Sequence, residues 1–199
     1  MPHKVVKKYT HSDKPHITIW SAINSELVIG PIFFTGGISS EAYKQTLKNF
    51  VSDLHQISNE NEHPILVQDD SKLHSNAEVV EFLEKEFPNH WIGTESKYAK
   101  WPHHSSDLSP INFFLWGYIK SRVYKTPIET GDVDELKKRI EAAFKNVTPD
   151  LLEEAIEEYK TRLERVVKTN GHLVDATIYG EEIDYDQLNV WGMYNWQYL

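Results

Sequence analysis

The chain has 199 residues, which is enough for one domain with a sizeable core and too few for two full domains. Its composition, 40% hydrophobic and 26% charged, excludes the disordered and fibrous classes. The net charge of −9 is opposite in sign to the basic surface of a self-sufficient DNA-binding domain, and the lack of cysteine excludes disulfides and thiolate metal sites. No apolar run approaches the roughly 18 residues of a membrane span, so we expect an intracellular protein with no membrane partner.

The first part of the chain predicts a hairpin, a helix and a buried strand. Residues 16–23 and 27–34 are apolar runs separated by a polar break, a pattern typical of two antiparallel strands joined by a tight turn. Ser39 then has the position of an N-cap for a helix that ends near His55. The continuous apolar run 65–67 predicts a buried central strand, and acidic residues follow at its end.

The next part predicts two helices and a strand between them. Residues 75–78, SNAE, have the spacing of a capping box with Ser75 as the cap, and residues 91–93 predict a third core strand. After a polar loop, Ser109 is followed by a proline, which is the usual beginning of a helix. This helix is rich in aromatic residues, is expected to be well buried, and has Asn112 in its first turn.

Two further helices complete the predicted fold. They begin at Asp132 and Thr148, and the second ends at Asn170 and Gly171. We expect the apolar seam of the second helix to pack on the domain. In an alternative, the seam also contacts a helix of a partner. The chain therefore divides into a core at 1–125, a helical extension of the same domain at 126–174, and an acidic aromatic tail at 175–199.

Two segments of the chain have recognisable sequence motifs. Residues 67–74 are VQDDSKLH, and residues 101–117 are WPHHSSDLSPINFFLWG. These motifs resemble QD(G/N)APxH and WPxxSPDLSPxDFFLWG of the mariner-type DNA transposases of the DDE/DDD superfamily, and the first implies that Asp69 is the second catalytic acid. The likeness extends from about Pro15 to Val174, so it covers most of the chain.

The resemblance implies both a fold and a chemistry. The implied fold is ribonuclease-H-like, an α/β mixed sheet flanked by helices with a helical C-terminal extension. The implied cofactor is Mg²⁺ or Mn²⁺, with Asp69 and residue 112 as catalytic and metal-binding positions, and the implied partner is DNA in the nucleus. Two divalent cations about 4 Å apart repel each other, so several carboxylates must hold them.

This chain departs from the family pattern at two of the three acids. The third acid is the aspartate of the longer motif, and Asn112 stands there; an amide oxygen can contact a metal but brings no charge. The first acid lies on a strand upstream of the hairpin, and the 15 residues before His16 leave no room for that strand or for the family's N-terminal helix-turn-helix region. Either Lys4–Tyr9 replaces the strand, or a partner completes the domain.

Our leading hypothesis is a transposase-derived DDE-type endonuclease domain that is catalytically inactive, and is either retained as a nucleic-acid or protein-binding module or degenerate. In it, Asp69 caps the turn that follows. One alternative is an active metal-dependent endonuclease completed by another subunit, by an upstream segment, or by Asp13 or Asp70. A second alternative is an adaptor that pairs with itself, as a homodimer, or with another protein through its C-terminal helix and tail. We expect His103 and His104 to be solvent-facing loop residues.

Overall fold

The computed structural model describes residues 17–57, 64–128 and 132–172. The expectations for Lys4–Tyr9, for Asp13 and for the tail 175–199 lie outside these residues. The helices and strands, in chain order, are β1 (Ile17–Ile23), β2 (Val28–Thr35), α1 (Ser40–Ile57), β3 (Leu66–Val67), α2 (Ala77–Glu86), β4 (Trp91–Gly93), β5 (Ala99–Lys100), the 3-10 helix η2 (Ser106–Leu108), the π-helical turn η3 (Ile111–Leu115), α3 (Trp116–Val123), α4 (Val133–Phe144) and α5 (Pro149–Lys168).

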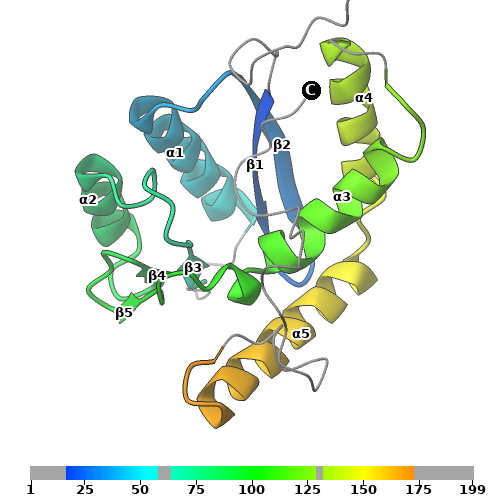
Figure 1. Cartoon of the computed structure of the whole chain (residues 1–199). Coiled ribbons are helices and arrows are strands. Elements are labelled where there is room, and N and C mark those ends of the chain that lie inside the picture. Colours follow the sequence, from blue (N-terminus) through cyan, green and yellow to red (C-terminus); the bar gives the residue numbers. More distant parts are fainter. Residues whose placement is uncertain (1–16, 58–63, 129–131, 173–199) are drawn as a thin grey trace, which may run out of the picture.

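Strands β1 and β2 form the predicted antiparallel hairpin, which lies between α1 and the pair of helices α3 and α4 (Figure 1). Ile17 pairs with Thr35, and Ile23 pairs with Val28 next to the turn. In the turn, Oδ1 of Asn24 accepts hydrogen bonds from two backbone N–H groups, at 2.9 and 2.7 Å. The short polar side chain therefore closes the turn at the polar break that the sequence predicted.

The two faces of the hairpin pack on different helices because successive strand residues point to opposite sides. Ile17 and Ile19 belong to a buried cluster with residues of α3 and α4. Trp20 and Ala22 pack instead against a cluster that includes α1, α2 and Trp91. The helical extension therefore contributes to the same core as the hairpin, through its first helix.

Strands β3, β4 and β5 form a separate parallel sheet in the order of their numbers. Leu66 of β3 pairs with Trp91 of β4, and Ile92 of β4 pairs with Ala99 of β5. We expected one mixed sheet with the strand at 65–67 in its centre. Within the described ranges no strand lies between β1 and β3, so this strand is at the edge of its own sheet. The α/β fold class is confirmed, and within the described residues the strands form two sheets and not one.

The start of α2 differs from the predicted capping box by one residue. Asn76, and not Ser75, is the N-cap, because its Oδ1 accepts the N–H of Glu78 at 3.0 Å. The Glu78 carboxylate does not turn back to the cap and instead pairs with Lys44 of α1, 3.2 Å away. Asparagine and serine are equally good caps, so propensity alone does not distinguish the two positions.

The helix after Ser109 begins with a wider turn than the sequence suggested. The backbone N–H groups of Asn112 and Phe113 both bond to the carbonyl of Ser109 at 2.9 Å, and residues Ile111–Leu115 form a π-helical turn before α3. Asn112 lies in this first turn, as predicted. The helix is less buried than expected, since Tyr124 is 45% exposed while Leu115, Ile119 and Val123 are fully buried. Only one apolar stripe of the helix faces the core.

Gly93 lies against the largest buried side chain of the β3–β5 sheet. A Cβ atom at Gly93 would stand 2.3 Å from Cζ3 of Trp91, whose side chain is 1% exposed and cannot move aside freely. We expect Gly93→Ala to lower the free energy of unfolding by about 1–3 kcal/mol through overpacking. Thermal or urea unfolding measures this. Gly117→Ala is the matched control, since nothing lies within 4 Å of its Cβ position. Equal effects of the two substitutions would contradict the prediction.

Glu84 of α2 connects this helix to the segment between β4 and β5. Its Oε1 accepts the Nε1–H of Trp91 and the backbone N–H of Lys97, both at 3.0 Å. The Lys97 N–H, followed by the Trp91 N–H and the Lys97 ammonium, overcomes the opposing effect of desolvation and holds the pKa of Glu84 below its ordinary value of 4.5. A carboxylate with a lowered pKa stabilises the fold above its ordinary pKa, and this contribution is lost as the pH falls through the lowered value.

We therefore expect Glu84→Gln to lower the melting temperature near neutral pH, where the charged acceptor is lost. The difference from the unaltered protein should shrink once the pH falls below the 4.5 that is ordinary for glutamate. Melting curves across this pH range measure the effect. Glu81→Gln on the exposed face of α2 is the control, and a Glu84→Gln difference that does not change with pH would contradict the assignment.

The last helix, α5, makes fewer contacts with the core than its apolar seam suggested. Leu152 and Ala155 are buried, whereas Leu163 is 39% exposed and Val167 is 77% exposed. Its ends agree with the prediction, because Thr148 accepts the N–H of Leu151 and the chain leaves the helix at Thr169. In the part of the chain that the structure describes, no helix has the length and apolar character needed to cross a membrane.

Candidate functional site

Asp69 stands just beyond the end of β3 and is held by His74 and by the backbone N–H of Ser71. Nδ1 of His74 lies 2.8 Å from its Oδ1, and the backbone N–H of Ser71 donates to the same oxygen at 3.2 Å. The His74 Nδ1 also lies 3.2 Å from the Asp69 carbonyl oxygen. Asp69 therefore caps the turn that follows the strand, which is the structural role that the sequence suggested for it.

Asn112 approaches Asp69 from the π-helical turn, 43 residues further along the chain. Its Nδ2 donates to Oδ2 of Asp69 at 3.4 Å, the oxygen opposite to the one that His74 contacts. The structure therefore brings together the two residues that the sequence motifs placed at the second and third acid positions. Their catalytic and metal-binding roles stay predictions, because geometry alone does not test them.

The surroundings of Asp69 favour the charged form of its carboxyl. Partial burial by itself raises the pKa of this carboxyl, but the hydrogen bond and charge of His74, the Ser71 N–H and the Asn112 amide outweigh the burial and hold the pKa below its ordinary value of 3.8. Each of these groups is a donor that stabilises the charged form. A single negative charge thus faces an amide and an imidazole.

A second layer of side chains supports His74 from α1. The ring of Tyr43 stacks on the His74 ring with 5.1 Å between centroids, and the Tyr43 hydroxyl accepts a hydrogen bond from Nε2 of Gln68. Burial is the main cause that raises the pKa of Tyr43. The sequence pattern indicated only that Tyr43 is a core residue of a helix. Its position opposite the strand end could not be found without the packing of α1 on β3.

The carboxylates of Asp69 and Asp70, which follow the end of β3, contact different segments of the chain. Oδ2 of Asp70 accepts the backbone N–H of His104 at 2.9 Å, and Nδ1 of His103 lies 3.9 Å from the same oxygen. Both histidines are exposed, as expected from the sequence. Asp70 therefore anchors the loop that leads to η2 and does not add a charge beside Asp69.

The donor set around Asp69 does not fit a pair of divalent cations. Two cations need several carboxylates, and the side chains around Asp69 are the imidazole of His74 and the amide of Asn112. Among the described residues, no group of three or more histidine, cysteine, aspartate or glutamate side chains could hold a metal ion. The residues present in the described part of the chain thus supply one charged ligand where the implied chemistry needs more.

The fold is the ribonuclease-H-like fold of transposase catalytic domains. The chain is similar to the Mos1 mariner paired end complex with Mn, with a TM-score of 0.65, 18% identity, and coverage of 86% of this chain and 48% of that chain. The Mos1 transposase catalytic domain with Raltegravir and Mg has a TM-score of 0.61 and 16% identity over 83% of this chain and 87% of that chain. This chain spans about half the length of the protein in the paired end complex.

The sequence itself matches the family model of the DDE superfamily endonucleases over residues 3–137. The chain therefore belongs to the DDE superfamily endonuclease family, and the resemblance found in its two motifs is confirmed at this level. The match ends inside α4, so α5 lies beyond it. Among curated proteins, none matches the sequence.

Proposed function

We propose that this chain is a DDE endonuclease domain that does not cut DNA by itself and has kept a binding role. The observation that carries the proposal is the contact between Asn112 and Asp69: an amide donates to the carboxylate, at 3.4 Å, from the position where the family has a third acid. An amide brings no negative charge to offset the repulsion between two divalent cations. Asp70 does not replace the missing charge, since it holds the loop at His104.

Metal binding and nicking of DNA test the first half of the proposal. We expect isothermal titration with MgCl₂ or MnCl₂ at millimolar concentration to show no binding, and a supercoiled plasmid to stay intact in the presence of the protein and either ion. Nicking that disappears in Asp69→Ala would overturn the proposal. It would favour an active endonuclease whose remaining ligands come from elsewhere.

For the second half, we propose that the retained partner is nucleic acid. The similar Mos1 structure was solved as a paired end complex, and this chain covers the same fold over 86% of its length. The net charge of −9 predicts weak binding that is lost as salt rises, because phosphate contacts depend on released counterions. On this proposal the protein acts in the nucleus.

Fluorescence anisotropy of a labelled DNA duplex, at low and at physiological salt, measures this binding. We expect the protein to bind DNA at low salt. Asp69→Asn should leave this binding unchanged, because contacts with the DNA phosphates do not depend on the metal site. No binding at either salt concentration would contradict the nucleic-acid role and would favour the protein-binding module instead. Imaging of a fluorescently tagged chain tests the nuclear location.

A further inference from the structure

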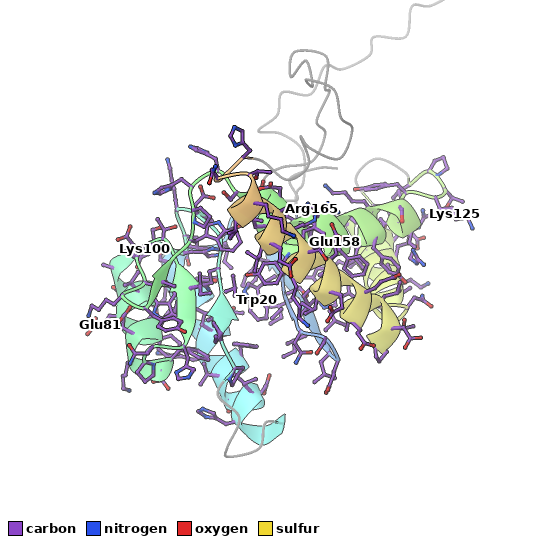
Figure 2. All side chains as sticks on the ribbon, turned by 90° about the horizontal axis from the view of Figure 1, so that it is seen from below. Trp20, Glu81, Lys100, Lys125, Glu158 and Arg165 are labelled. Atoms are coloured by element: carbon purple, nitrogen blue, oxygen red, sulfur yellow. The ribbon has the colours of Figure 1, made fainter. Side chains whose placement is uncertain are left out.

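Arg162 is the one arginine or lysine in the described part of α5 that is buried, with 8% of its surface exposed. A buried cation costs free energy unless its donors are paired. Its Nε donates to Oε1 of Glu158 at 2.9 Å. Glu158 lies one turn earlier on the same helix and is labelled in Figure 2. The other partners of Arg162 belong to a different part of the chain.

These partners lie in the segment that carries Asn112. Nη1 of Arg162 donates to the carbonyl oxygen of Asp107 in η2, at 2.9 Å, and this contact is buried. The guanidinium carbon lies 4.2 Å from the centroid of the Phe113 ring, in a cation–π arrangement. Asp107 precedes the bend at Ser109, and Phe113 directly follows Asn112. One planar guanidinium thus touches the segment on both sides of its bend.

A second contact of α5 supports the same segment. Val166, one turn after Arg162, packs against the buried pair Trp101 and Leu108. The position of η2 and η3 is therefore fixed from the side of α5, outside the region of the chain that matches the family model. The Asn112–Asp69 bond, at 3.4 Å, is already near the limit of hydrogen bonding, so a small shift of this segment would break it.

We propose that Arg162 is a positioning residue that holds Asn112 within reach of Asp69. It deepens the proposed function and rests on it, because it concerns the same carboxylate and amide. A guanidinium suits this role better than an ammonium, since its flat face stacks on Phe113 while its edge donates to Asp107. Helix α5 thereby takes part in the site through its contacts with Asp107 and Phe113.

NMR of the full chain, without added metal, tests the proposal. The signals to follow are the side-chain amide of Asn112 and the imidazole of His74, which lies on the far side of Asp69. We expect Arg162→Met to shift both signals and to speed exchange of the Phe113 backbone amide by about tenfold or more, the ratio that corresponds to losing one charge-assisted hydrogen bond. Arg162→Lys keeps the positive charge without the planar guanidinium, and it should shift the same signals by less.

Arg165→Met on the same helix is the matched control and should leave the signals of Asn112 and His74 in place. If Arg162→Met moves the signals of Asp107 and Phe113 but not those of Asn112 and His74, Arg162 only packs the helix and the proposal is wrong. If Arg162→Met does not fold, Arg162→Lys decides by the same two signals. Metal titration is a separate measurement, so a failure of the proposed function is distinguishable from a failure of this positioning role.

Discussion

Asn112→Asp is expected to give the Asp69 site an affinity for Mn²⁺ that, on the proposed function, the unaltered protein should not have. In the structure Nδ2 of Asn112 lies 3.4 Å from Oδ2 of Asp69. The substitution replaces this donating nitrogen by a carboxylate oxygen at about the same distance. Two carboxylates at this separation repel each other and cannot both ionise freely, so without metal the variant should be less stable near neutral pH. A divalent cation removes this repulsion and binds to both carboxylates.

The melting temperature with and without MnCl₂ measures this change. A cation that binds only the folded state stabilises it by about 2.7 kcal/mol at a concentration one hundred times its dissociation constant. For a chain of this size such a gain corresponds to a rise of several degrees, while the unaltered protein should show none. Isothermal titration of the same samples gives the affinity.

The double substitution Asp69→Asn with Asn112→Asp is the matched control, because it again leaves one carboxylate and one amide at the site. It should lose the response to Mn²⁺. A response of the unaltered protein equal to that of Asn112→Asp would show that the amide is already an adequate ligand. That result would refute the proposal that the amide of Asn112 prevents metal binding.

Leu115→Ala is expected to cause the largest loss of stability among single apolar deletions near the site. Leu115 ends the π-helical turn that carries Asn112, its side chain is fully buried, and it belongs to the cluster that joins β1, α3 and α4. Removing a buried leucine side chain costs about 2–5 kcal/mol, because contacts are lost and a cavity stays. The free energy of unfolding of a typical domain is about 5–15 kcal/mol in total, so the variant should be partly unfolded at physiological temperature.

Urea unfolding followed by tryptophan fluorescence measures this loss. Leu163→Ala removes the same atoms from α5, where the side chain is 39% exposed, and should cost less than about 1 kcal/mol. Similar losses for the two variants would mean that Leu115 is not packed as described. The comparison therefore tests the position of the turn as well as the size of the core.

Much of the local structure follows from the sequence because its signals are local. Asn24 closes its turn through its own side chain, and Asp132 caps α4 through the N–H three residues later. Thr148 and the following proline begin α5 in the same way. The N-cap of α2 shows the limit of such signals. The sequence predicted Ser75 and the structure has Asn76, and either residue type can cap a helix.

By itself, the sequence determined the α/β class, the hairpin and the two motif positions, Asp69 and Asn112, because these depend on apolar period, turn chemistry and the residue types of a recognisable motif. Only the tertiary structure decided that an amide hydrogen of Asn112 points at Asp69, that Tyr43 stacks behind His74, and that Arg162 reaches the segment of residues 107–113 from α5. These contacts join residues far apart in the chain. Their geometry depends on how helices and strands pack, and no local pattern encodes that packing.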